Sequence, residues 1–385
     1  MVAYLGYLLL AGVQSIFMHK KAKLGGRQFG VREYLILCCV EIILLAGLRG
    51  FTVGADTKVY LDALEYYSSL PKNELLFAKL VHPFDFEPGY FLFTKLCAFL
   101  NMPKAIFLFV VAAIIYIPVF CSIYRYSRMP YISILTYFAL GIFAYSLGIF
   151  RQMMALSIML CGLKYFEEGK WIPYFLLVIL AATFHVTALA MIIVYFLYHF
   201  HVERYAKWIA VAQIVCFVLG RPLIMVATFI FPQYSHYLGG KYDVQGGTYL
   251  MLLFLNVILY ARIYLCRRGI LKNRVDIAAL SFGVVVQAIG YSMALFGRLV
   301  PYFSFFAIFS IPDILYALMY RPNLYRMVRK DVFDVWDKCS EIVANNKAIC
   351  RMLVWVVFVI GLMALVLKDL VGNQYVVPYT FFFMK

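Results

Sequence analysis

The sequence has few charged residues for its length. Only 14% of its 385 residues are Asp, Glu, Lys or Arg, whereas 65% are hydrophobic. A soluble chain of this size cannot bury so much apolar surface, so the composition excludes an ordinary water-soluble protein. The stretch 132–149 carries no charge, and 208–231 and 249–266 reach or approach the length that crosses about 30 Å of hydrocarbon. The sequence therefore predicts an integral membrane protein.

Paired cysteines are also lacking. The nine cysteines are scattered, and none shows a CxxC or Cys/His spacing, which argues against a disulfide framework or a zinc site. No basic segment precedes the first apolar run, 2–18, and no small-residue cleavage site follows it. We therefore expect this run to be a retained first span rather than a cleaved signal.

Twelve apolar stretches are candidate membrane spans. They are 2–18, 34–50, 104–124, 132–149, 153–166, 171–184, 186–200, 208–231, 249–266, 276–296, 299–320 and 352–368. Two regions are ambiguous: 171–200 is either one tilted span or a pair of short ones, and 87–100 is either a span or a helix lying at the membrane interface. The predicted fold is all-α and polytopic, with about twelve transmembrane helices.

The distribution of positive charge decides both ambiguities. The net charge is +16, and 21 of the 35 Lys and Arg residues lie in five stretches: 19–33, 125–130, 201–207, 262–274 and 321–351. Basic loops stay on the cytoplasmic side. All five reach that side only if 171–200 crosses twice and 87–100 stays at the interface. The charge thus indicates membrane orientation rather than nucleic-acid binding.

This topology predicts one transmembrane domain, 1–385, with both termini outside. It has an outer loop, 51–88, an interfacial helix near 87–100 and a cytoplasmic segment, 321–350. Several ionisable residues then remain at the outer ends of helices. They are Arg49, Asp56, Glu87, Arg151, His185, Arg221 and Arg298. Ionisable groups near membrane depth are costly unless they face protein or water, so the arginines suggest one outer cavity suited to a phosphate group.

Each of these residues also has a plainer explanation. Arg49, Arg151, Arg221 and Arg298 are possible headgroup anchors, because long cationic side chains reach the interface from helix ends. His185 is a candidate for an ordinary buried histidine. Asp56 suits the start of a helix, and Glu87, before Pro88, suits a turn.

The order of these residues resembles the EpsG family of bacterial exopolysaccharide proteins, a branch of the Wzy-like polysaccharide polymerases. The matching stretches are short, but together they are spread over nearly the whole sequence. They are Arg49-Gly50 with Gly54-Ala55-Asp56-Thr57 and Tyr60; Glu87-Pro88-Gly89-Tyr90; 150–155; 184–189; 298–303; and Pro378-Tyr379. One departure is Ala55, where a polar residue is expected before the aspartate.

The resemblance implies a fold related to the GT-C membrane glycosyltransferases. It also implies joining of undecaprenyl-pyrophosphate-linked oligosaccharide repeat units at the outer face of the bacterial plasma membrane, in exopolysaccharide, capsule or O-antigen biosynthesis. A flippase and a chain-length regulator are the implied protein partners. No cofactor is expected. The candidate catalytic residues are Asp56, Glu87, Arg151, His185 and Arg298, and the candidate substrate-binding residues are Arg49, Tyr60, Tyr90, Gln152, Arg221 and Tyr302.

In this hypothesis, arginines stabilise the leaving pyrophosphate and His185, Asp56 or Glu87 removes the proton of the acceptor hydroxyl. A metal-assisted version stays open, because Asp56, Asp62 and Glu65 share the first outer loop.

Three other classes compete: a lipid-linked-oligosaccharide flippase or transporter, a membrane O-acyltransferase acting on glycan, and a GT-C enzyme that adds single sugars. A transporter is expected to show internal repeats and charges at mid-membrane. An essential histidine on the cytoplasmic side would favour the acyltransferase.

Overall fold

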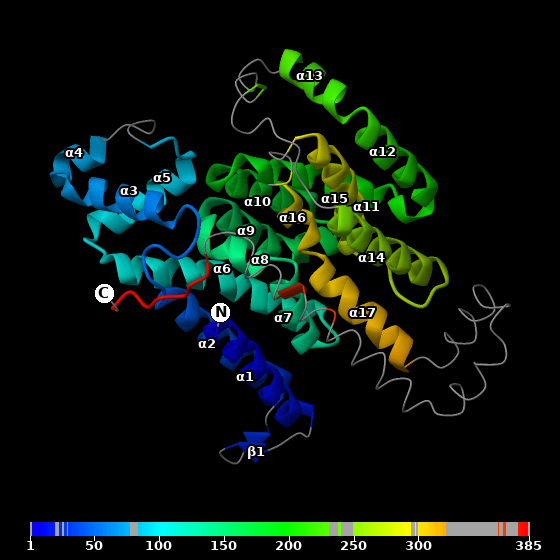
Figure 1. Cartoon of the computed structure of the whole chain (residues 1–385), viewed down its shortest axis with the longest axis horizontal. Coiled ribbons are helices and arrows are strands. Elements are labelled where there is room, and N and C mark those ends of the chain that lie inside the picture. The colour runs from blue at the N-terminus through cyan, green and yellow to red at the C-terminus, as the bar shows by residue number, and fades with distance from the viewer. Residues whose placement is uncertain are drawn as a thin grey trace.

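The computed structural model describes residues 2–19, 23–24, 27–28, 30–77, 84–230, 238–239, 249–293, 297, 299–320, 361, 365–366 and 376–383. Apart from one hairpin of two short strands, the regular structure in these residues is helical (Figure 1). The all-α prediction is therefore confirmed for this part of the chain. The segment 321–350 and most of the predicted span 352–368 fall outside it, as does most of the stretch 232–248, which the predicted topology places as a second outer loop.

The first part of the chain forms a helical pair and an adjoining helical group. Helices α1 (Val2–His19) and α2 (Val31–Gly47) are linked through the antiparallel strands β1 (Lys23–Leu24) and β2 (Arg27–Gln28). Then follow α3 (Thr57–Ser69), α4 (Lys72–Phe77), α5 (Pro88–Phe99) and α6 (Lys104–Tyr126). Helices α3, α4 and α5 lie together at one end of the molecule (Figure 1). α5 begins with Pro88, whose fixed backbone angle suits the first turn of a helix.

The charge-free stretch 132–149 is broken rather than straight. Helix α7 (Pro130–Ala139) and helix α8 (Ile142–Gly148) meet at an angle of 63°. Gly141 between them has a φ of 71°, a left-handed conformation that glycine adopts without steric cost. Helix α9 (Phe150–Glu167) starts directly after this broken pair.

The stretch 171–200 forms a hairpin of two short helices, so it is divided where the sequence predicts; that each arm crosses the membrane stays a prediction. It contains α10 (Trp171–Phe184), the short 3₁₀ helix η1 (Val186–Ala190) and α11 (Met191–His199). The hydroxyl of Tyr174, near the start of α10, donates a hydrogen bond to Met191 O at 3.1 Å, and its ring stacks on Tyr195 at 5.4 Å. The two arms therefore run side by side, and His185 lies at the turn.

The remaining elements complete the bundle. They are η2 (Val202–Tyr205), α12 (Ala206–Val218), α13 (Gly220–Ile230), α14 (Tyr249–Arg267), α15 (Val275–Ser292), α16 (Val300–Ser304) and α17 (Ala307–Tyr320). Among the described residues, five helices are long and apolar enough to cross a membrane, and the number rises to seven if each of two bent pairs counts as one span. A multi-pass membrane protein is thus supported, whereas the count of twelve stays a prediction.

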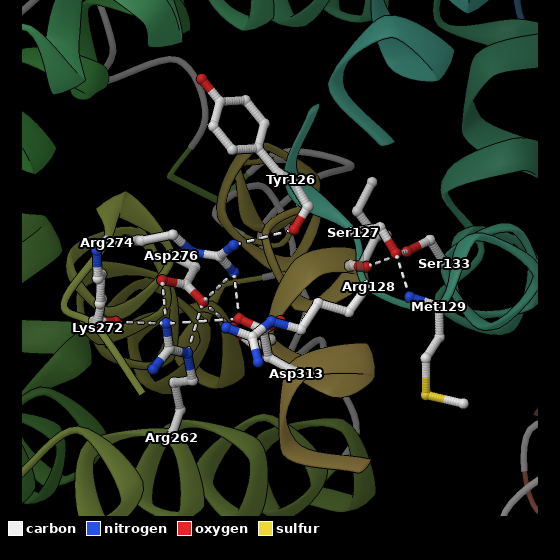
Figure 2. A network of polar contacts seen from close by, with 12 residues as sticks. Tyr126, Ser127, Arg128, Met129, Ser133, Arg262, Lys272, Arg274, Asp276 and Asp313 are labelled. Carbon is white, nitrogen blue, oxygen red and sulfur yellow. Dashed lines mark hydrogen bonds and ion pairs between the residues drawn. The ribbon is translucent and has the colours of Figure 1, made fainter. Parts of the chain in front are cut away.

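A buried ionic network joins the ends of several helices (Figure 2). Arg262 of α14 binds Asp276 of α15 through Nε and Oδ2 at 2.9 Å, and Arg274 binds Asp313 of α17 at 2.9 Å. Arg128, which precedes α7, approaches the other oxygen of Asp313 at 3.3 Å. The side chains of Arg262 and Asp276 are 0% and 1% exposed. Arg262 was expected in a basic loop, but α14 continues past it and its charge is paired inside the bundle.

The helices α6 and α9 connect this network to the opposite end of the molecule. At one end of α6, Lys104 pairs with Glu65 of α3 at 2.7 Å; at the other end, Arg125 approaches Glu167, the last residue of α9, at 3.8 Å. Helix α9 therefore starts near the α3–α5 group and ends near the network. Its 18 residues correspond to a length of about 27 Å.

Candidate active site

Glu87 binds two other predicted site residues at the same time. Its Oε2 atom receives a hydrogen bond from Arg151 Nη1 at 2.5 Å, and its Oε1 atom lies 2.7 Å from His185 Nδ1. Arg151 Nη1 also donates to the main-chain oxygen of Asp85 at 3.2 Å. Three residues that are 34 to 98 positions apart in the chain thus form one connected cluster, which we call the Glu87 cluster.

The local backbone explains how each side chain reaches the cluster. Glu87 immediately precedes α5 as its N-cap residue and has an extended backbone, and its carboxylate reaches Arg151 and His185. Arg151 is in the first turn of α9, just after the break at Ile149. His185 lies in the extended turn between α10 and η1, with φ −157° and ψ 120°.

The cluster is half-buried, and its charges stabilise one another. The side chains of Glu87, Arg151 and His185 are 18%, 26% and 23% exposed. Burial alone raises the pKa of Glu87, but the hydrogen bond with His185 and the charge of Arg151 outweigh it and bring the pKa to about 2. Glu87 is therefore ionised at neutral pH.

Aromatic rings form one wall of the cluster. The guanidinium of Arg151 lies over the Phe86 ring at 5.2 Å, an arrangement that favours a cation. Tyr60 of α3 stacks on Phe150 at 4.6 Å and meets the edge of Tyr90 of α5 at 5.2 Å. Burial raises the pKa of Tyr60, whereas the neighbouring Arg151 lowers it. The predicted residues Tyr60 and Tyr90 thus lie beside Arg151.

Several buried polar atoms around the cluster make no hydrogen bond of good geometry among the described residues. They are Tyr90 Oη, Arg151 Nε, Thr187 Oγ1 and Tyr302 Oη. The hydroxyls of Tyr302 and Thr187 interact weakly with each other, and Tyr302 also lies within electrostatic range of Glu87. Buried polar atoms of this kind are suited to contact with a polar ligand or water. Thr187 was not among the predicted site residues, although it lies two positions after His185 in the matching stretch 184–189.

Arg49 is placed differently from Arg151. Only 1% of it is exposed, and its guanidinium donates hydrogen bonds to the carbonyl oxygens of Ala46 and Leu147 and lies over the Phe150 ring at 5.3 Å. Arg49 therefore ties the end of α2 to the end of α8. Pyrophosphate binding by Arg49 stays a prediction.

The turn that follows Arg49 packs against the same end of α8. Gly54 has a φ of 103°, and a Cβ atom there would collide with Leu147 O. Thr57 Oγ1 donates a hydrogen bond to that oxygen at 2.9 Å. Asp56 precedes α3 as its N-cap residue, without a side-chain capping bond, and lies exposed within electrostatic range of Tyr60.

The other predicted site residues occupy separate positions or lie outside the described part. Gln152 is buried in α9 directly after Arg151, and Arg221 is exposed at the start of α13. Arg298 falls outside the described residues, so its role stays a prediction. Across the part of the chain that the structure describes, no three His, Cys, Asp or Glu side chains gather as metal ligands would.

Comparison with known proteins gives one match. The family model of the EpsG family matches residues 33–325, which contain every member of the Glu87 cluster. No curated protein and no solved structure matches the chain. The matched residues are more than half of the chain and include all the stretches whose order first suggested the resemblance except Pro378-Tyr379, which lies beyond them. This multi-pass membrane protein belongs to the EpsG family.

Proposed function

We propose that this protein is a polysaccharide polymerase that joins undecaprenyl-pyrophosphate-linked oligosaccharide units at the outer face of the bacterial plasma membrane. Membership of the EpsG family supports a polymerase-like membrane protein. The observation that carries the proposal is the Glu87 cluster, in which an arginine and a histidine meet at one carboxylate. It lies at the end of α9 opposite the basic loops. With those loops in the cytoplasm, the cluster faces outside.

The proposed reaction is glycosyl transfer between two lipid-linked chains. The hydroxyl oxygen of the acceptor sugar bonds to the anomeric carbon of the donor, and the bond from that carbon to the pyrophosphate oxygen breaks. Undecaprenyl pyrophosphate leaves with the bonding electrons, and the acceptor proton passes to a base of the cluster. Charge develops on the leaving group, which is where a fixed cation lowers the barrier.

Arg151 is the cation that suits this role. Its Nη1 atom is held by Glu87 and Asp85 O, and its guanidinium also interacts with the Tyr60 hydroxyl. A guanidinium anchored in this way keeps its orientation, and its fixed positive charge favours an anion. Arg298, Arg221 and Arg49 are proposed to support it, and Gln152, Tyr60, Tyr90 and Tyr302 to contact glycan.

Replacement of Arg151 tests the proposal. In producing cells that lack the native copy, Arg151→Ala and His185→Ala are expected to abolish the polymer ladder while the lipid-linked single unit accumulates. Arg151→Lys is not expected to restore the ladder, because an ammonium lacks the planar fork. Lys58→Ala, an exposed change on α3, serves as the control and should leave the ladder intact.

Each alternative has its own outcome in the same cells. Full-length polymer from both Arg151→Ala and His185→Ala refutes the proposed site. A flippase defect would leave the lipid-linked unit on the inner leaflet, and an acyltransferase defect would give polymer of normal length without acyl groups. A single-sugar transferase defect would shorten the repeat unit itself. A flippase and a chain-length regulator are the proposed protein partners.

A further inference from the structure

We infer that Glu87 is a positioning residue and that His185 Nε2 is the atom that takes the proton of the acceptor hydroxyl. The inference rests on the proposed polymerase function and assigns the base within it. From the sequence, Asp56, Glu87 and His185 are equivalent candidates for the general base. The geometry of the Glu87 cluster distinguishes between them.

Glu87 is unsuited to act as the base. Both of its carboxylate oxygens are engaged: Oε2 by Arg151 at 2.5 Å, and Oε1 by His185 at 2.7 Å and more distantly by Val186 N at 3.5 Å. Its pKa of about 2 makes it a weak proton acceptor at neutral pH. A carboxylate that is so bound orients its neighbours instead of exchanging protons.

The same contacts determine which nitrogen of His185 is free. An ionised carboxylate only accepts hydrogen bonds, so the nitrogen that faces it, Nδ1, must carry a proton. In a neutral imidazole the other nitrogen, Nε2, is then the acceptor. Glu87 thus selects the tautomer in which Nε2 can receive a proton, and it stabilises the imidazolium that forms.

The backbone holds this pair in place. His185 N donates to Ala181 O at 3.0 Å, and His185 O accepts from Ala188 N at 3.0 Å, so the turn is bonded on both sides. The side chain of His185 keeps 23% of its surface exposed and is reachable by a substrate. Asp56 lacks comparable support, because it is exposed and makes no side-chain capping bond.

Charged and titratable groups from several elements face the pair. Among the described residues they are Arg151 of α9, Tyr60 of α3, Tyr90 of α5 and Tyr302 of α16. Asp85, in the loop before Glu87, contributes its main-chain oxygen. Arg151 is the cation among these groups, and it binds Glu87 directly. Replacing Glu87 therefore removes a partner of His185 and of Arg151 together, and the test must separate these two effects.

The first measurement reports the tautomer without any enzyme activity. The full-length protein, labelled with ¹⁵N at its six histidines and reconstituted in lipid, is observed by NMR, and His185→Gln identifies the His185 signals. The expected spectrum at neutral pH has a protonated Nδ1 and an unprotonated Nε2. In Glu87→Gln this tautomer is expected to lose its dominance. A protonated Nε2 in the unaltered protein overturns the inference.

The second measurement is the rate of polymer formation. Right-side-out membrane vesicles from producing cells supply their own lipid-linked units. His185→Ala is expected to reduce the rate at least about 100-fold. Glu87→Gln is expected to reduce it at least about tenfold, because an amide no longer selects the tautomer with an unprotonated Nε2. Glu87→Asp should be slower than the unaltered protein but faster than Glu87→Gln, because it keeps a carboxylate. Glu74→Gln, exposed on α4, is the matched control and should leave the rate unchanged.

The two proposals fail in distinguishable ways. If Arg151→Ala and His185→Ala stop polymerisation, but Glu87→Gln keeps the normal rate and the normal His185 tautomer, the positioning role is wrong and the polymerase proposal stands. If Asp56→Asn stops polymerisation and His185→Ala does not, the assigned base is wrong. If none of these variants affects polymer, the proposed site itself is wrong. Thermal unfolding of each purified variant identifies any that are misfolded. If Glu87→Gln is misfolded, the rate of Glu87→Asp and the NMR spectrum of the unaltered protein test the positioning role instead.

Discussion

At the scale of single residues, two arginines that each lie over a phenylalanine ring, Arg49 over Phe150 and Arg151 over Phe86, differ in what they bind. Arg151 pairs with a carboxylate and is 26% exposed, whereas Arg49 is buried against main-chain oxygens. Both lie at helix ends and look alike in the sequence. Their surroundings give Arg151 a place in the candidate site and Arg49 a place between α2 and α8.

Arg49→Ala is expected to destabilise the protein. The change leaves the carbonyl of Ala46 without its bond from Arg49 and removes one of two bonds to Leu147 O, which costs about 1–3 kcal/mol for a buried acceptor. Thermal unfolding in detergent, compared with the exposed change Lys58→Ala, measures the difference. Equal unfolding temperatures for the two variants would contradict this structural role.

The ionisation of Glu87 also predicts how stability depends on pH. Its pKa falls from an ordinary 4.5 to about 2 on folding, so the folded state binds the proton more weakly than the unfolded state. This contributes about 3 kcal/mol at neutral pH, which is lost as the pH falls from about 4.5 to about 2. Unfolding temperatures of the unaltered protein and Glu87→Gln should therefore converge on acidification. A constant difference between them across this range would refute the assignment.

At the scale of elements, the turn 54–57 positions α3 against the end of α8. The turn brings Gly54 so close to Leu147 O that a side chain has no room, and its φ of 103° is one that other residues rarely adopt. Tyr60 follows one turn later on α3 and stacks on Phe150, the residue before Arg151. The turn therefore supports the aromatic wall of the cluster through packing.

Gly54→Ala is expected to lower stability by more than about 1 kcal/mol, because both the backbone angle and the contact with Leu147 O oppose a Cβ atom. The polymerisation rate should fall as well if the aromatic wall shifts. Gly6→Ala in α1 is the control, since no atom lies within 4 Å of its added Cβ. An unfolding temperature of Gly54→Ala as high as that of Gly6→Ala would show that the close approach is unimportant.

At the scale of the whole molecule, two ionic clusters lie at opposite ends of the bundle. The buried network of Arg262, Arg274, Asp276 and Asp313 joins α14, α15 and α17 (Figure 2). Losing one partner of a buried ion pair leaves an uncompensated charge. An intact network therefore stabilises this end of the helices. The Glu87 cluster differs from it, because its side chains are partly exposed.

Asp276→Asn is expected to cost about 3–5 kcal/mol, because it weakens the bonds from Arg262, Arg274 and Ser310 together. Thermal unfolding and the yield of folded protein in membranes measure the loss. Glu168→Gln, at an exposed pair with Lys170, should leave both unchanged. If Asp276→Asn unfolds like that control, the network is not a stabilising element.

Sidedness is the second prediction at this scale. In a version without the nine native cysteines, Glu74→Cys on α4 should react with a membrane-impermeant maleimide in intact cells. Glu168→Cys, between α9 and α10, should react only in inside-out vesicles, because it lies at the opposite end of α9 from the cluster. The reversed pattern would place the Glu87 cluster in the cytoplasm and favour an acyltransferase.

The sequence by itself determined the membrane character and the all-α class, and it placed Glu87, Arg151 and His185 within a larger set of candidate residues. A long apolar run is stable in a bilayer as a helix, because a helix satisfies its own backbone hydrogen bonds. Charged residues in so apolar a chain are few and costly, so they are candidates for function. The division of 171–200 into a hairpin also followed from the charge of the flanking loops. These properties depend on composition and local order, which a sequence displays directly.

Only the tertiary structure decided which residues meet. Glu87, Arg151 and His185 are far apart in the chain, and the pairing of one carboxylate oxygen with each partner depends on how α5, α9 and α10 pack. Burial likewise distinguished Arg49 from Arg151 and placed Arg262 in a paired network instead of a loop. The charge of an arginine is visible in the sequence, but its partner is set by helix packing between distant segments.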